Sequence, residues 1–138
     1  MKKKITLGAH PYIYPMPTVI VGSLIDGSPN FTTASYVGIV QHTPPMVSVT
    51  LVNTHITNTG IKQNKVFSIN IPNTRMLRVT DFVGMNSGDK VDKAALFKVF
   101  YGELKNAPMI METPLNLECR LIQFDLLEYT IGWLFQVR

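Results

Sequence analysis

The strict alternation of residues 46–51 (MVSVTL) is the feature that most limits the fold of this chain. In a strand, Met46, Ser48 and Thr50 point to one face, and the intervening Val, Val and Leu point to the other. Hydroxyl groups that are buried need hydrogen-bond partners. The segment therefore predicts a strand with one apolar face and one small, polar face.

Similar runs recur at short intervals along the chain. We predict strands at residues 18–24, 30–36, 46–51, 66–71, 115–122 and 129–137. Gly27 lies in a turn sequence between the first two runs and indicates a hairpin. Pro44 and Pro45 cannot donate to a strand ladder, so they precede the third run, and Pro72 ends the fourth. Short strands with turns between them indicate a barrel or a sandwich.

Two short helices are expected among these strands. Thr57 is suited to be the N-cap of a helix that ends at Asn64. Asp92 is a plausible N-cap for a second helix at residues 93–101, where apolar residues recur at helical spacing. A polar loop is expected at residues 84–92. The predicted fold class is therefore all-β, mainly β with two short helices.

Length and composition indicate one domain over residues 1–138 that associates with a second copy. A chain of 138 residues buries roughly two-thirds of its unfolded surface, so it needs neither a disulfide nor a metal to fold. Hydrophobic residues make up 46% and charged residues only 16%. Because so few charges cover the surface, we expect a homodimer to cover part of the apolar area.

Charge and cysteine content exclude several classes of protein. The net charge is +4, and Lys2, Lys3 and Lys4 supply three of these charges, so the rest of the chain lacks a basic stripe for nucleic acid. We expect these lysines to form a disordered, solvated arm. No run resembles a secretory signal or a membrane span, so a cytoplasmic protein with no membrane partner is expected. Cys119 is the single cysteine and lies in an alternating segment, which predicts a buried structural thiol.

Common catalytic motifs do not occur in the sequence. It contains neither the glycine-rich dinucleotide fingerprint nor a phosphate loop of the Walker type. His10, His42 and His55 lack the spacing of metal ligands, so no metal site is predicted. If the chain does chemistry, a cofactor must therefore carry it, and no side chain is predicted to be catalytic.

A set of short motifs follows a specific order along the chain. The set begins with DGSPN (26–30), TTASY (32–36), TPP (43–45) and MVSVTL (46–51). It continues in the same order with NTHIT (53–57), FSINIP (67–72), TDF (80–82), SG (87–88), DK (92–93), AP (107–108) and LECRL (117–121). Each motif is weak alone, but their order over residues 15–123 is specific and resembles the flavin reductase-like family, which includes the flavoredoxins.

The resemblance implies an FMN-binding split barrel with Greek-key connections and a homodimer with one flavin near each subunit interface. It assigns the flavin ring and ribityl chain to a segment and a neighbouring strand that comprise Asn30, Thr32, Thr33, Ala34, Ser35, Tyr36, Ser48, Val49 and Thr50. It assigns the 5′-phosphate to the pair His55 and Thr57. It assigns the phosphate or the dimethylbenzene side of the flavin to a loop and the following helix start, with Ser87, Gly88 and Lys93.

Physical chemistry supports these assignments independently. Thr57 at a helix start offers a hydroxyl and free backbone N–H groups to an anion, and Lys93 would add a positive charge. Small residues such as Ala34 and Ser48 would let the backbone approach a flat ring, and Tyr36 could cover one ring face.

Each of these residues also has a plainer interpretation. Thr57 could be only an N-cap, and His55 could be an exposed loop histidine. Lys93 could be a solvated helix residue, and Tyr36 could be ordinary strand packing. The pair at residues 87–88 could be only a turn.

The end of the chain departs from the family pattern. Family members usually continue further, and Tyr129 replaces a histidine that is usual near the last strand. The resemblance implies an oxidoreductase that moves electrons from NAD(P)H or a protein donor through FMN. The alternative is a non-enzymatic electron carrier of the flavoredoxin type that meets a redox partner protein. The altered C-terminal end motivates a third hypothesis, a barrel that has lost flavin binding.

Overall fold

One curled antiparallel sheet dominates the structure, which is a computed structural model that describes residues 1–138. Its seven strands follow the order β2-β1-β5-β8-β9-β4-β3. Their bounds are Val19–Ile25 (β1), Ser28–Ala34 (β2), Val37–Gln41 (β3), Met46–Val52 (β4), Val66–Ile71 (β5), Leu115–Leu126 (β8) and Thr130–Val137 (β9). The remaining elements are α1 (Thr57–Asn64), α2 (Leu77–Met85), the two-stranded ladder of β6 (Val99–Phe100) and β7 (Met109–Ile110), and 3₁₀ turns at Thr74–Met76 and Ala94–Leu96.

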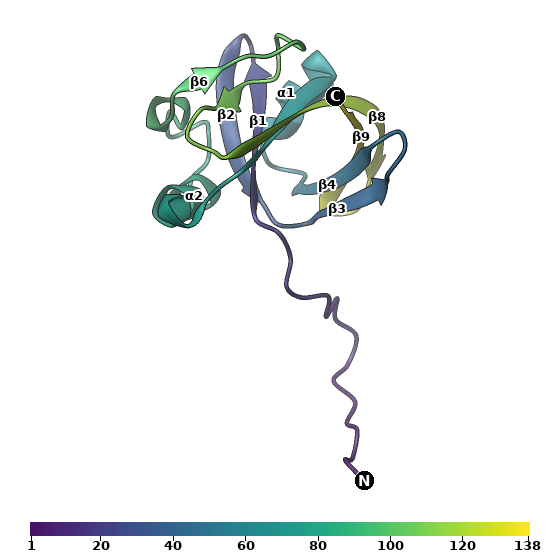
Figure 1. The fold of residues 1–138 in the computed structure, drawn as a ribbon. Helices are drawn as coiled ribbons and strands as arrows, with labels where there is room; N and C mark the ends of the chain where they lie inside the picture. The colour runs from purple at the N-terminus through teal and green to yellow at the C-terminus, as the bar shows by residue number, and fades with distance from the viewer.

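The sheet closes on itself as a half-barrel (Figure 1). Strands β2 and β3 stand at opposite ends of the strand order, yet only Ser35 and Tyr36 join them. The backbone N–H of Thr50 in β4 donates to the Tyr36 carbonyl at 2.9 Å, which ties this link to the far end of the sheet. The prediction of an all-β fold with two short helices is confirmed.

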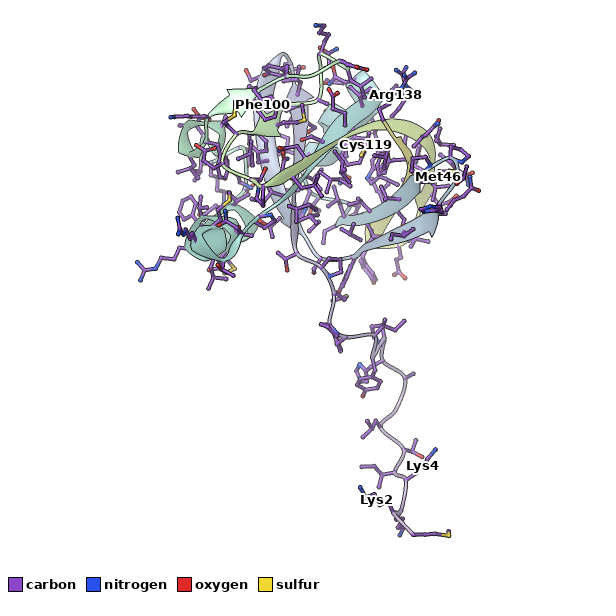
Figure 2. All side chains as sticks on the ribbon, in the orientation of Figure 1. Lys2, Lys4, Met46, Phe100, Cys119 and Arg138 are labelled. Atoms are coloured by element: carbon purple, nitrogen blue, oxygen red, sulfur yellow. The ribbon has the colours of Figure 1, made fainter.

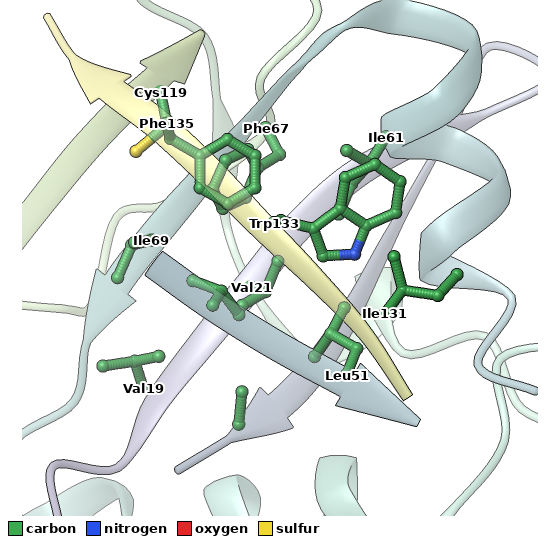
Figure 3. Packing of buried hydrophobic residues seen from close by; sticks show 12 residues of the cluster. Val19, Val21, Leu51, Ile61, Phe67, Ile69, Cys119, Ile131, Trp133 and Phe135 are labelled. Atoms are coloured by element: carbon green, nitrogen blue, oxygen red, sulfur yellow. The ribbon is translucent and has the colours of Figure 1, made fainter. Parts of the chain in front are cut away.

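The barrel is filled by a cluster of 12 buried residues, which come from alternate positions of its strands and, in the case of Ile61, from α1 (Figure 3). Phe67 and Phe135 have ring centroids 3.8 Å apart, and Trp133 lies beside Phe135. Burying an aromatic side chain of this kind stabilises a fold by about 2–3 kcal/mol. Val49 and Leu51 are buried in this cluster while Ser48 and Thr50 are half-buried, as the alternation of residues 46–51 predicts.

A second cluster fixes α2 against the outer face of β1 and β2. It consists of Ile20, Phe31, Met76, Val83 and Ile110. The β6–β7 ladder supplies Ile110, and α2 supplies Val83, which is fully buried. The end of α2 therefore lies beside β2, where it contributes to the candidate site.

Helix α1 lies unusually close to β1 because of one glycine. A Cβ atom added to Gly60 would lie 2.6 Å from Ser23 Oγ and would collide with the Leu24 carbonyl. Ser23 Oγ in turn donates to the Thr57 carbonyl at 3.3 Å. This close packing holds the N-terminus of α1 next to the β1–β2 hairpin.

Several local predictions are wrong. The helix predicted at residues 93–101 is a 3₁₀ turn over Ala94–Leu96 followed by β6, because Val99 and Phe100 pair with β7. Strand β3 and helix α2 were not predicted, and the second short helix is therefore α2. Thr57 is the first residue of α1 but not its N-cap; that position is Ile56, and no side chain caps the helix.

The chain begins with an extended arm that runs away from the barrel (Figures 1 and 2). Residues 1–18 form no helix or strand, and nearly all of them are exposed. Cys119 is buried in the barrel, as predicted, and burial together with the charge of Glu118 raises the pKa of its thiol to about 12. No helix is long and apolar enough to cross a membrane.

Candidate functional site

Three adjoining hollows follow the edge of β2 near the start of α1. We call the first the polar hollow; it has a volume of about 250 Å³, and its lining includes Thr32, His55, Thr57, Ser87, Gly88 and Lys93. The second, the ring hollow, has a volume of about 150 Å³, and its lining includes Thr33, Ala34, Ser35, Tyr36, Thr50, His55 and Thr130. The third, the outer hollow, has a volume of about 360 Å³, and its lining includes Asn30, Ile56, Gly88, Asp89, Lys90 and Lys93. His55 joins the first two hollows, and Gly88 and Lys93 join the first and third.

Thr57 is held so that it can donate a hydrogen bond into the polar hollow. It is only 1% exposed, and Asn30 Nδ2 donates to its Oγ1 atom at 3.0 Å. Because this oxygen already accepts a hydrogen bond, the hydroxyl proton remains free for another acceptor. The backbone N–H groups of Asn58 and Thr59 are paired with the His55 and Ile56 carbonyls, so the Thr57 N–H is the further donor at the start of the uncapped helix. The start of α1 therefore offers the hydroxyl and the backbone N–H of Thr57.

Gly88 is required where the loop after α2 passes over Asn30. A Cβ atom at this position would collide with Asn30 Oδ1 and lie 3.2 Å from Ile56 Cγ2. Asn30 cannot simply move away, because it is buried and bonded to Thr57. The Ser87 carbonyl accepts from the backbone N–H of Lys90 at 3.1 Å, which closes the loop into a turn. The absence of a side chain at Gly88 thus keeps both the loop and the Asn30–Thr57 bond in place.

Lys93 brings a buried positive charge to the wall of the polar hollow. Its side chain is 4% exposed, and Nζ donates to the Val83 carbonyl at the end of α2 at 2.8 Å. Burial lowers the pKa of Lys93, while the charge of Asp89 acts in the opposite direction. An ammonium group has three donors, and one carbonyl satisfies one of them. The site therefore fits a ligand that carries negative oxygens.

His55 has a ring nitrogen without a partner at the junction of the polar and ring hollows. Its Nδ1 atom is buried and has no hydrogen-bond partner. Burial first, and then the charge of Lys93, lower the pKa of His55 from its ordinary 6.5. Buried polar atoms in proteins are nearly always paired. Because the His55 side chain lines both hollows, a ligand that enters them is placed to change the hydrogen bonding of this ring.

The ring hollow is less polar and more open. Thr33 Oγ1 is turned toward α2 and donates to the Thr80 carbonyl at 2.6 Å, so it ties β2 to that helix. Tyr36 is 57% exposed and stands at the open side. Thr130 from the start of β9 completes the wall.

The structure brings most of the predicted site residues together. Of the 14, only Ser48 and Val49 line none of the three hollows. Val49 is fully buried in the barrel core, and Ser48 lies half-buried beside Gly38 of β3. Asn30 reaches the site through its bond to Thr57 and through the outer hollow.

Some lining residues were not singled out from the sequence. Thr54 and Ile56 flank His55, and Gly84, Met85 and Asn86 come from the end of α2. A correct prediction of α2 would have pointed to the latter group. Thr54 and Ile56 carry no signal beyond their position next to His55.

Comparison with known proteins identifies relatives of this sequence and fold. The model of the flavin reductase like domain family matches residues 12–137. The chain is similar to a flavoredoxin from Methanosarcina acetivorans, with 40% identity and a TM-score of 0.94 over 99% of this chain and 73% of that one. It is also similar to the flavoredoxin of Desulfovibrio vulgaris (Miyazaki F), with 33% identity and a TM-score of 0.87 over 98% and 74% of the two chains.

Two further relatives extend the comparison. An FMN-binding protein from Thermus thermophilus shares the fold, with a TM-score of 0.86 at 20% identity, over 100% of this chain and 79% of that one. An uncharacterized protein from Archaeoglobus fulgidus is 29% identical over 114 residues, which are 81% of this chain. The match covers only 64% of the length of that relative. The sheet order, the two short helices and the match over residues 12–137 lead to one assignment: the chain belongs to the flavin reductase-like family.

Proposed function

We propose that this chain binds FMN and is an oxidoreductase that moves electrons from NAD(P)H or a protein donor through the flavin. The observation that carries the proposal is that two side chains with unused hydrogen-bonding capacity line the same hollow. Lys93 is buried and donates only one hydrogen bond, and His55, which also lines the ring hollow, has a ring nitrogen without a partner. The similarity to two flavoredoxins at 40% and 33% identity supports it.

The polar hollow suits the phosphate of FMN. A phosphate monoester carries close to two negative charges at neutral pH and offers three acceptor oxygens. The hydroxyl and the backbone N–H of Thr57 would donate to these oxygens. Lys93 would contribute a charge-assisted bond, and Gly88 would let the loop backbone approach. Positive helix ends favour anions for the same reason.

The ring hollow suits one side of the isoalloxazine. Ala34 and Ser35 are small, so the backbone after β2 can come close to a flat ring, and Tyr36 can lie over it. Thr50 and Thr130 add hydroxyl groups at the edge. When bound, FMN supplies the redox chemistry, and the protein residues hold the ring in place and leave its exposed side open to a donor.

A homodimer is part of this proposal. Ile39 of β3 is 86% exposed, Leu126 of β8 is 68% exposed and Tyr129 is 71% exposed. Apolar side chains of this size on a sheet are typical of surfaces that a partner covers. Light scattering after size-exclusion chromatography tests the dimer; a mass of one chain would contradict it.

A non-enzymatic electron carrier is the second candidate function. Two relatives above 30% identity are called flavoredoxins, which favours it. The two candidates differ in their response to nicotinamide nucleotides. If NADH or NADPH bleaches bound FMN without air, and does so again each time air is admitted to reoxidise the flavin and then removed, the chain is an enzyme. Reduction only by a low-potential protein identifies a carrier.

The first test is the visible spectrum of the purified protein with added FMN, followed by identification of the flavin that acid releases. We expect a yellow protein that releases about one FMN per chain. Thr57→Val should lower the FMN affinity about tenfold, since one hydrogen bond to a charged group is lost. Thr59→Val is the matched control, because Thr59 is exposed on the same helix. A protein that stays colourless with excess FMN would contradict the proposal.

A further inference from the structure

The unpaired Nδ1 atom of His55 has a consequence for ligand binding that depends on pH. We propose that His55 takes up a proton when a phosphate monoester binds in the polar hollow, so that the affinity of the chain for FMN increases as the pH falls toward 6. This inference rests on the proposed FMN function and adds a proton to it. No covalent or redox step is involved, because the proton comes from solvent and stays on the imidazole.

The geometry around His55 disfavours a charged imidazole in the free protein. A charged imidazole has two N–H donors, and each needs an acceptor when buried. Nδ1 is buried and has no acceptor in the protein. The backbone N–H of His55 donates to the Val52 carbonyl at 3.0 Å, so the backbone is fixed at this point. The His55 side chain lines the polar hollow, so rotation of the imidazole toward that hollow on binding would give the buried N–H a ligand oxygen as its acceptor.

The charged groups that face His55 act in the same direction. The lining of the polar and ring hollows contains Lys93 and Tyr36 as its other titratable residues, and it contains no carboxylate. Lys93 is cationic and therefore opposes a second positive charge nearby. Asp89 and Lys90 line the adjoining outer hollow, where Asp89 offsets part of the Lys93 charge. Burial and Lys93 together hold the pKa of His55 below its ordinary value.

A bound phosphate dianion reverses this balance. It brings close to two negative charges against the single charge of Lys93. A second positive charge on His55 then becomes favourable, and its proton has an oxygen to bind. By linkage, a ligand that raises the proton affinity of a group must itself bind more tightly when that group is protonated.

Calorimetry of FMN binding at pH 7.5 in two buffers of different ionisation enthalpy measures this proton directly. At that pH the phosphate is already a dianion, because its second pKa is about 6. We expect the wild type to take up about 0.5 to 1 proton per FMN. His55→Gln should abolish the uptake of the proton. The FMN affinity of the wild type should change by up to about tenfold per pH unit, and the affinity of His55→Gln should lack this change. The matched control is His42→Gln, because His42 is exposed in the β3–β4 turn, and it should behave as wild type.

The outcomes separate the inference from the proposed function. FMN binding without proton uptake, or equal uptake in His55→Gln, would overturn the inference and leave the function standing. Failure to bind FMN at every pH would overturn both. If His55→Gln does not fold, NMR titration of the wild-type histidines replaces it. Saturation with FMN should raise the His55 pKa, whereas riboflavin, which lacks the phosphate, should leave it unchanged; equal shifts would overturn the inference.

Discussion

Two clusters of buried polar side chains flank β1 on either side, and they differ in how completely they are hydrogen bonded. On the β5 side, Asn70 Nδ2 donates to the Ile20 carbonyl and to Ser68 Oγ, both at 2.9 Å. Its Oδ1 atom accepts from the Ile110 N–H at 3.0 Å and from Asn116 Nδ2 at 2.7 Å. Every polar atom of the Asn70 side chain therefore has a partner within the protein.

On the β2 side, the pairing is incomplete. Asn30 and Thr57 are bonded to each other, but His55 Nδ1 has no partner, and Lys93 donates a single bond from its three donors. A fully paired network stabilises one structure, whereas unpaired buried groups cost free energy unless something else binds them. The β5 cluster therefore stabilises the fold, whereas the β2 cluster keeps unused hydrogen-bonding groups that suit the proposed ligand.

The largest effect is expected on stability, when a residue of the fully bonded β5 cluster is replaced. Asn70→Ala removes four hydrogen bonds and leaves the Ile110 N–H unpaired, so the free energy of unfolding should fall by about 3 kcal/mol. Urea denaturation measures this loss. Asn106→Ala is the control, because Asn106 is exposed. The FMN affinity of the folded variant should stay within a factor of about two; a large drop would show that the clusters are not independent.

Lys93→Met tests the β2 cluster, in which hydrogen bonding is incomplete. The FMN affinity should fall about 30-fold, because a charge-assisted bond contributes about 2 kcal/mol. The free protein should be as stable as the wild type or more stable, because a buried ammonium with one acceptor is costly. Fluorescence titration and urea denaturation measure the two quantities, with Lys62→Met as the control, because Lys62 is exposed and lines none of the three hollows. Lost stability with unchanged affinity would make Lys93 a structural residue.

Gly88→Ala should have a smaller effect on the same site. Its Cβ atom would displace Asn30 from Thr57, so the Thr57 hydroxyl would lose its orientation. We expect the FMN affinity to fall about tenfold, the loss of one hydrogen bond to a charged group. Gly38→Ala is the matched control, because a Cβ atom there has only an ordinary contact, 3.7 Å from Ser48 Oγ. Equal affinities of the two variants would argue against the role of the 87–88 loop.

The smallest effect concerns the pH dependence of stability without flavin. Because the pKa of His55 is lowered on folding, the unfolded chain binds more protons than the folded one below pH 6.5. The contribution of His55 is therefore fully present above pH 6.5 and is lost as the pH falls toward the lower, folded value. Between pH 7.5 and 5.5, the melting temperature should decrease less for His55→Gln than for the wild type or His42→Gln. An identical decrease in all three would contradict the assigned shift.

The strands were predictable because their patterns are local. Residues 46–51 alternate without exception, and the structure buries Val49 and Leu51 as expected. Turn formers around Gly27 mark the β1–β2 hairpin in the same way. Strand β3 was missed because neither of its faces is buried. Its apolar residues Ile39 and Val40 are adjacent and both exposed, so the segment does not show the alternation of a half-buried strand.

The helical predictions failed where distant contacts decide the structure. Residues 93–101 have apolar residues at helical spacing, but pairing with β7 draws Val99 and Phe100 into a strand. Helix α2 was missed because only Thr80 and Val83 of its nine residues are buried, so its apolar face is short. In both cases the deciding partner lies elsewhere in the chain.

The candidate site was predictable in its residues more than in its geometry. The motif resemblance pointed to His55, Thr57 and Lys93, and all three line the polar hollow. The burial of Lys93 could not be anticipated, because it depends on a bond to the Val83 carbonyl of an unpredicted helix. The bond from Asn30 to Thr57 joins residues 27 positions apart and has no local signal either.

The burial of Cys119 simplifies a reductive titration of the bound flavin, in which the electrons taken up per chain are counted. A thiol whose pKa is raised to about 12 has almost no thiolate at neutral pH, and the thiolate is the form that reacts with oxidants and disulfides. As the only cysteine, it also has no partner for an internal disulfide. With FMN bound, a dithionite titration should end at about two electrons per flavin, with no thiol contribution to subtract.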